Sequence, residues 1–429
     1  MSLTTNNPSG GSRGKWDAYR VYLIHGAVTA LFFDIAFALN LVYQAQVIGL
    51  DPLQLVLVGT TLEVAVLLFE VPTGIVADLY SRRLSIIIGF ALVGVGILIE
   101  GLFPTFAAVL LAQVVWGIGI TFTSGASQAW ITDEVGEARA AQAFVRGGQI
   151  GSVVGMVGLW ISIALASVAL NLPLIVAGIG FLLLTGFLIL VMPETGFKPN
   201  RVEGRSSLQS MAHTMRESAR LVRVKPVLLT VLALNVVYGA YSESYDRLWR
   251  KHLMDNFTLP GIGELDPLVW FGIIGMMGAV FTLALQEFAR RRVNMNQHRA
   301  TVRALMWIYG IMALTVVAFS LTTEFPLALA GLWLVGALRA TGGPIYDAWL
   351  NQNAEPELRA TMFSLSGQSN ALGQIAGGPL VGWIGARTTV RASLLIGGVI
   401  MAAALPLLNR SLRRDDVATE DAALSVTNV

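Results

Sequence analysis

The sequence predicts an all-α membrane protein with twelve transmembrane helices arranged as two related halves. Three observations predict it. Of the 429 residues, 55% are hydrophobic and only 13% are charged, whereas a soluble domain carries roughly 25% charged residues. Twelve apolar runs are each long enough to cross about 30 Å of hydrocarbon. Part of the first half of the chain is also repeated in the second.

The first six predicted spans follow one another with short polar turns. They cover about 20–48, 53–77, 84–102, 106–131, 140–169 and 172–192. Pro52 suits the first turn of the second helix, and Pro104 follows the third. Residues 1–19 form a polar N-terminal tail without an apolar core. We therefore expect no cleavable signal peptide and expect the first span to direct insertion.

The second six spans are predicted at about 226–248, 268–288, 300–321, 326–350, 361–384 and 390–408. The sequence thus indicates two six-helix units, 20–193 and 226–409, joined by a linker at 194–225. Apolar residues at helical spacing and several arginines in this linker predict an amphipathic helix at the membrane surface. Residues 410–429 are expected to be a cytoplasmic tail, and its polar part after Arg414 is expected to be disordered.

The distribution of basic residues predicts the orientation. With an even number of spans, both termini lie on the same side. On that side fall 23 of the 29 Lys and Arg residues, five fall on the other side, and Arg339 lies within a span. Because positive charge accumulates on the cytoplasmic side, we expect both termini in the cytoplasm and the protein in the cell inner (plasma) membrane.

An internal repeat supports the two halves. A shift of 219 residues aligns eight identical residues between positions 117 and 158 without a gap. The pairs Trp130 with Trp349 and Gln149 with Gln368 weigh most, because Trp and Gln are uncommon in membrane spans. The repeat places the fourth and fifth spans on the tenth and eleventh.

The charged turn between the second and third spans carries a recognisable motif. Residues 70–83 read EVPTGIVADLYSRR. This stretch resembles the signature loop between helices 2 and 3 of the major facilitator superfamily, G-x-x-x-D-[RK]-x-G-[RK]-[RK]. The matching positions are Gly74, Asp78, Arg82 and Arg83. Leu79 and Ser81 depart from it, so a basic contact and a glycine turn are missing; the alternative is an ordinary positively charged turn.

The resemblance extends over all twelve spans. Pro193-Glu194-Thr195 is similar to the P-E-T turn after helix 6, and residues 373–382 are similar to the glycine-proline pattern of antiporters, although that pattern stands in helix 5 there. Plain packing glycines are the alternative. In helix 4, Gln113 stands where proton-coupled members often carry arginine. The family resemblance implies two pseudo-symmetric six-helix bundles.

Two ionisable residues inside spans are the leading site candidates, because burying charge in a membrane is costly. Asp34 lies near the middle of helix 1, which lines the central cavity in the family's fold. We expect it to bind a proton or a cationic substrate, with a structural hydrogen-bonding role as the alternative. Arg339 in helix 10 needs a carboxylate or an anionic substrate. Asp34 could be its partner, and the sequence leaves both interpretations open.

Helix 7 offers a second group. Tyr238, Tyr241 and Glu243 form a plausible site for a lipophilic cation. The alternative is an interfacial aromatic belt with a solvated ion pair between Asp246 and Arg247, which we favour for that pair.

Gln113 and Trp116 in helix 4 could also face the cavity, although Trp more often serves packing. Glu63 and Glu70 in helix 2 are expected to contact helix 11 across the boundary between the halves, in a gating or a structural role. At the inner ends we predict a gate network. Its members are Asp78, Arg82, Asp133 and Arg146. Ion pairs in loops are worth only about 0–1 kcal/mol, which suits a latch that opens in every cycle.

The resemblance implies a secondary active transporter that works by alternating access and is similar to drug:proton antiporters. We expect proton-coupled efflux of lipophilic or cationic small molecules by a monomer in the lipid bilayer. Alternatives are uptake or uniport of an anionic metabolite anchored by Arg339, and a non-transporting receptor or lipid-flipping protein. The chain has no cysteine and only four scattered histidines. No enzyme activity, cofactor, metal or nucleic-acid partner is therefore expected.

Overall fold

The computed structural model describes residues 16–198, 226–261, 263, 266–353 and 359–413. In this part of the chain the secondary structure is helical and no strand occurs. The helices form twelve rods, ten of which are long and apolar enough to cross a membrane. The remaining two, α10 and α14, carry more polar residues. The predicted all-α fold with twelve spans is confirmed.

The first half of the chain contributes six rods. They are α1 (Ala18–Phe37) with α2 (Asn40–Gln46), α3 (Pro52–Leu79), α4 (Arg82–Leu102), α5 (Phe106–Thr123) with α6 (Ala126–Val135), α7 (Glu137–Ala166) and α8 (Leu172–Val191). Two of the predicted spans are thus broken. The break before α6 follows from Gly125, whose φ of 69° lies in the left-handed region.

The second half contributes the other six. They are α10 (Pro226–Asn256), α11 (Val269–Arg292), α12 (His298–Leu321), α13 (Phe325–Asn353), α14 (Arg359–Arg387) and a last rod, Val390–Arg413, that begins with α15 (Val390–Ala402). Most of the predicted linker and both outer tails fall on residues 1–15, 199–225 and 414–429. The amphipathic helix predicted in the linker therefore lies largely outside the described residues.

Side-chain caps fix where two helices of the first half begin. Asp51 forms a capping box with Gln54, and Pro52 occupies the first turn of α3. Ser81 caps α4 by accepting a hydrogen bond from the backbone N–H of Leu84. The serine that replaces the motif glycine is therefore the residue that starts α4.

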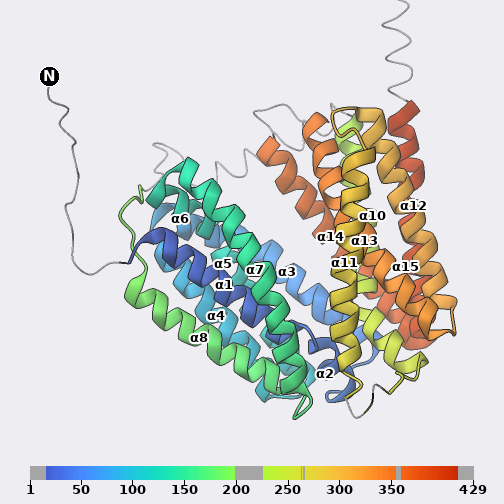
Figure 1. Cartoon of the computed structure of the whole chain (residues 1–429), viewed down its shortest axis with the longest axis horizontal. Coiled ribbons are helices and arrows are strands. Elements are labelled where there is room, and N and C mark those ends of the chain that lie inside the picture. The colour runs from blue at the N-terminus through green and yellow to red at the C-terminus, as the bar shows by residue number, and fades with distance from the viewer. Residues whose placement is uncertain (1–15, 199–225, 262, 264–265, 354–358, 414–429) are drawn as a thin grey trace, which may run out of the picture.

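The two halves meet at one end of the molecule. We call the end where the described chain begins and stops the terminal end, and the other the opposite end. Helices α3 and α14, α3 and α10, α2 and α10, and α7 and α11 pack across the boundary. In Figure 1 the two sets of ribbons come together near α2 and diverge toward the terminal end.

Small residues allow the close approach at the opposite end. A Cβ atom on Gly382 of α14 would lie 3.0 Å from the Cβ atom of Val56 and 3.2 Å from the Cα atom of Leu53, both on α3. A Cβ atom on Gly378 would lie 3.0 Å from Val56 Cγ1. The glycines of α14 therefore serve helix packing between the halves.

The repeat seen in the sequence is visible in the burial of its strongest pair. Trp130 is 1% exposed and Trp349 is 0% exposed, each inside its own half. Trp130 Nε1 donates to the carbonyl oxygen of Pro193 at 2.7 Å. The two tryptophans thus occupy the core in both halves, as the alternative packing role predicts.

Candidate functional site

The first polar centre joins α13 to α10. Arg339 forms a two-pronged ion pair with Asp246, in which Nη2 lies 2.8 Å from Oδ2. Its Nε donates to the hydroxyl of Tyr238 at 3.2 Å. The guanidinium carbon lies 5.7 Å from the ring centroid of Tyr245. A planar guanidinium suits this combination of a paired carboxylate and aromatic rings.

This geometry corrects two expectations. Arg339 is paired with Asp246 of its own half, and the structure does not bring it together with Asp34. The predicted solvated pair between Asp246 and Arg247 is wrong, because Arg247 Nε instead lies 3.1 Å from Glu243 Oε1. The two charged residues point to different sides of α10, which sequence proximity alone does not reveal.

A small polar cavity lies beside this ion pair. Its volume is about 130 Å³, and its lining comes from α10, α12, α13 and α14. The lining residues are Asn235, Tyr238, Tyr309, Arg339, Gly342, Gly343, Tyr346 and Asn370. Asn235 Nδ2 donates to Ser366 Oγ at 2.8 Å and also to the Tyr346 hydroxyl. The cavity therefore offers a cation and several hydrogen-bonding groups to a ligand.

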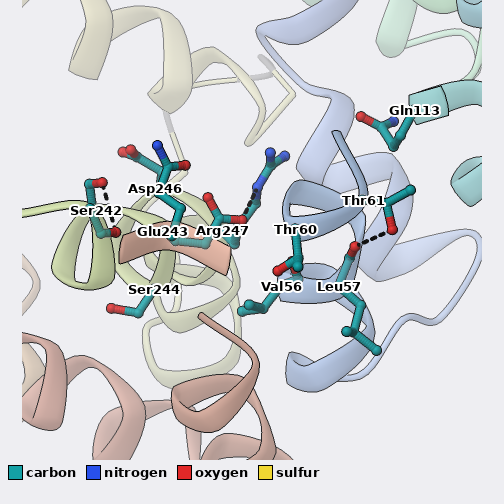
Figure 2. Close-up of polar contacts among 12 residues, drawn as sticks. Val56, Leu57, Thr60, Thr61, Gln113, Ser242, Glu243, Ser244, Asp246 and Arg247 are labelled. Carbon is teal, nitrogen blue, oxygen red and sulfur yellow. Dashed lines mark hydrogen bonds and ion pairs between the residues drawn. The ribbon is translucent and has the colours of Figure 1, made fainter. Parts of the chain in front are cut away.

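Glu243 occupies the boundary between the halves. Its side chain is 3% exposed. A Cβ atom on Gly59 of α3 would overlap both Glu243 Oε1 and Arg247 Nε, and the Glu243 Cγ atom packs against Gly378. Figure 2 shows Arg247 reaching from α10 toward α3 with Glu243 beside it. Of the predicted cation site, only Tyr238 lines the cavity; Tyr241 and Glu243 are buried and do not line it.

Asp34 lies where α1 packs against α7. Within the fully described stretch from Val21 to Phe37, it is the only exposed side chain. The small residue Gly155 makes room for it, because a Cβ atom there would overlap Asp34 Oδ2. The Asp34 carboxyl group forms no hydrogen bond or ion pair with any residue that the structure describes. The carboxyl group is therefore free to bind a proton or a ligand.

The helix 4 candidates face inward. Gln113 is 2% exposed and donates from Nε2 to Glu100 Oε2 at 3.0 Å. Trp116 Nε1 donates to Gln113 Oε1 at 3.0 Å. Sequence reasoning missed Glu100, which lies two residues before the predicted end of the third span. An ionisable residue inside a span is by itself a signal of a functional site. Glu100 was overlooked because it lies close to the end of the predicted span.

The predicted gate network is only partly assembled. Arg82 Nη1 lies 3.0 Å from Asp133 Oδ2. Asp78 and Arg146 are exposed and form no hydrogen bond or ion pair in the part of the chain described here. Arg83 Nη2 donates to the carbonyl oxygen of Ile189 at 2.6 Å. All these contacts lie within the first half, so they brace that half and do not bridge the two.

Two glutamates that the predicted gate network did not include complete this brace. Glu194 accepts from the Ser81 hydroxyl at 2.6 Å and from the Arg83 backbone N–H at 2.9 Å. Glu134 accepts from the backbone N–H and the hydroxyl of Thr195. The Pro193-Glu194-Thr195 turn is thereby tied to the starts and ends of neighbouring helices.

The remaining gating candidates lie on α3. At Gly74 an added Cβ atom would meet no described atom within 4 Å, so no close helix packing depends on this glycine. Glu63 interacts electrostatically with Arg247 and Glu243 of α10. Glu70 is exposed.

Two six-helix halves of mostly apolar helices that meet at one end define a polytopic membrane protein. A family model described as Major Facilitator Superfamily matches residues 22–304. The chain belongs to this superfamily, and it is a membrane transporter.

Similar proteins agree with this assignment. The "Uncharacterized MFS-type transporter YxaM" of Bacillus subtilis (strain 168) is 26% identical over 357 residues, which are 82% of this chain and 85% of that protein. A mutant of the nucleoside transporter NupG has a TM-score of 0.75 at 14% identity and covers 92% of this chain and 99% of its own. A bacterial homologue of the human lysosomal transporter Spinster, inward-facing and occupied, has a TM-score of 0.71 at 14% identity, over 93% of this chain and 98% of its own. Both structures share the fold.

Proposed function

We propose that this transporter exports lipophilic or cationic small molecules and is driven by proton influx. In this proposal Asp34 takes up the proton or the positive charge of the substrate. The main observation behind the proposal is that Arg339 forms its ion pair with Asp246. Asp246 neutralises Arg339, and no cation among the described residues forms an ion pair with Asp34, so its carboxyl can load and release a proton.

The shape of the molecule supports alternating access. The halves pack together at the opposite end and diverge at the terminal end (Figure 1). With both termini in the cytoplasm, as the basic residues predict, this conformation is open to the cytoplasm. An inward-facing conformation is also named for the similar Spinster homologue. A substrate would then enter from the cytoplasm and leave when the opposite end opens.

Transport into everted membrane vesicles tests the proposal. The assay uses a panel of lipophilic cationic dyes and metabolites, with and without an imposed pH gradient. We expect dye accumulation that requires the gradient and is lost in Asp34→Asn. The matched control is Glu324→Gln, which removes an exposed carboxyl in the turn before α13. No accumulation of any compound, with or without the gradient, would instead favour a receptor or lipid-flipping protein.

The cavity next to Arg339 favours a second candidate, uptake or uniport of an anionic metabolite. A carboxylate substrate could displace Asp246 from Arg339 and also bind the amides and hydroxyls of the lining. This function predicts that Arg339→Ala abolishes binding while Asp34→Asn is tolerated. The same vesicle assay therefore separates the two candidates.

A further inference from the structure

A buried carboxyl in the first half lies in a cage of amides. Glu100, on α4, is 1% exposed. Gln44 Nε2 of α2 donates to Oε1 at 2.6 Å, and Gln113 Nε2 of α5 donates to Oε2 at 3.0 Å. Because Trp116 Nε1 donates to Gln113 Oε1, the Gln113 amide is held with its NH₂ group toward the acid. Both carboxylate oxygens thus have neutral donors.

The cage also contains acceptors that lack a donor. Asn40 Oδ1 and Gln44 Oε1 are buried and receive no hydrogen bond from the described residues. Asn40 lies beside the Glu100 carboxyl. A buried acceptor without a donor costs free energy. An O–H group on Glu100 would supply a donor at this place, whereas an ionised carboxylate cannot.

The charges around Glu100 are few. From α2, Tyr43 donates its hydroxyl to the Glu100 backbone carbonyl oxygen at 3.0 Å. Helices α5 and α8, which pack against α4, contain no charged residue. On α3, Glu63 interacts with Arg247. Arg247 also interacts electrostatically with Glu100. The hydrogen bond of the Arg247 guanidinium is made to Glu243, which lies on the same helix.

We propose that Glu100 is a second proton-binding carboxyl and that Arg247 couples its protonation to the opening of the opposite end. Arg247 belongs to the second half, and Glu100 to the first. When the halves separate there, Glu100 loses the nearby positive charge, and a buried carboxylate without a cation is costly. The Glu100 carboxyl would therefore bind a proton more tightly with the opposite end open than in the conformation described here.

The chemistry of the cage favours a proton over a sodium ion. Both carboxylate oxygens already accept N–H donors, which a metal ion would have to displace. The direction of proton movement rests on the proposed export function. Proton binding at Glu100 does not depend on the export function, so an experiment can refute one of these proposals without refuting the other.

Infrared difference spectroscopy of the full-length protein in lipid tests the inference. Spectra are recorded between two pH values, and the C=O stretching band of protonated carboxyls is followed at a pH at which exposed carboxyls are ionised. We expect a component of this band to be lost in Glu100→Gln and to remain in Glu324→Gln and Asp34→Asn. In Gln113→Leu the component should shift in frequency, because the carboxyl loses one hydrogen bond. Gln113→Leu therefore provides a second test of the inference if Glu100→Gln does not fold.

The expected coupling between Arg247 and Glu100 can be measured with the same infrared band. Arg247→Gln should increase the Glu100 component, since the cation that favours the ionised form is removed. A band that is identical in the parent, Glu100→Gln and Gln113→Leu would overturn the inference. So would a spectral change at Glu100 that follows sodium concentration and not pH. If the component is present while vesicles show no proton-driven export, Glu100 remains a proton site and the proposed function fails.

Discussion

Opening of the opposite end can be forced by a single substitution. Gly382 of α14 has no room for a side chain, because an added Cβ atom would lie 3.0 Å from Val56 Cβ and 3.2 Å from Leu53 Cα. Overpacking a tight interface costs about 1–3 kcal/mol. In Gly382→Leu this strain is present only while the halves are closed. The ratio of closed to open molecules should therefore fall by about 5- to 150-fold.

The chain is well suited to this measurement because it contains no cysteine. Spin labels attached to Gln46→Cys and Met254→Cys report on the boundary, since the Gln46 and Met254 side chains touch across it at 3.3 Å. Pulsed electron resonance then gives the populations of short and long distances. The matched control is Gly367→Leu on the same helix, where an added Cβ atom would meet nothing within 4 Å.

We expect the long-distance population to grow in Gly382→Leu and to stay at the parent value in Gly367→Leu. Both changes replace glycine by leucine in α14, so differences in helix propensity cancel. An unchanged distance distribution in folded Gly382→Leu would refute the reasoning, because the closed interface would then tolerate the added side chain.

Two further predictions concern stability in detergent, followed by thermal unfolding. Trp130→Phe removes the donor to the buried Pro193 carbonyl oxygen and should lower the free energy of unfolding by about 1–3 kcal/mol. The control Trp307→Phe changes a side chain that is 73% exposed and should leave the stability nearly unchanged. Equal losses in the two variants would contradict this prediction. Asp246→Leu and Arg339→Met should each cost about 1–3 kcal/mol, because each leaves an unpaired charge whose side chain is only partly exposed, 24% for Arg339 and 46% for Asp246, and the double variant should regain most of the loss. Additive losses would mean that the ion pair is energetically unimportant.

The helices could be predicted from the sequence because hydropathy is a local property. Ten of the twelve rods pass as apolar spans on composition alone. The break after Phe37 could not be predicted, since no proline or glycine marks it. It places Asn40 and Gln44 next to Glu100, and that arrangement depends on how α2 packs against α4.

The sequence identified several residues of the candidate site, but it did not identify which of them interact with one another. Asp34 and Arg339 were found because charges are rare inside spans. The partner of Arg339 was not, because Asp246 lies 93 positions away from it in the chain. The same limit applies to Glu194, whose partner Ser81 is 113 positions away in the chain. Such pairs are set by tertiary packing.

The polarity of α10 has a consequence for biogenesis. Each charged residue at the centre of a helix opposes insertion by about 2.5–3.5 kcal/mol, and α10 is not among the helices apolar enough to span on composition. Asp246 finds its partner Arg339 only after α13 has been synthesised. During translation the first half can therefore enter the bilayer by its own hydrophobicity, while α10 has to wait at the translocon for helices that leave the ribosome later.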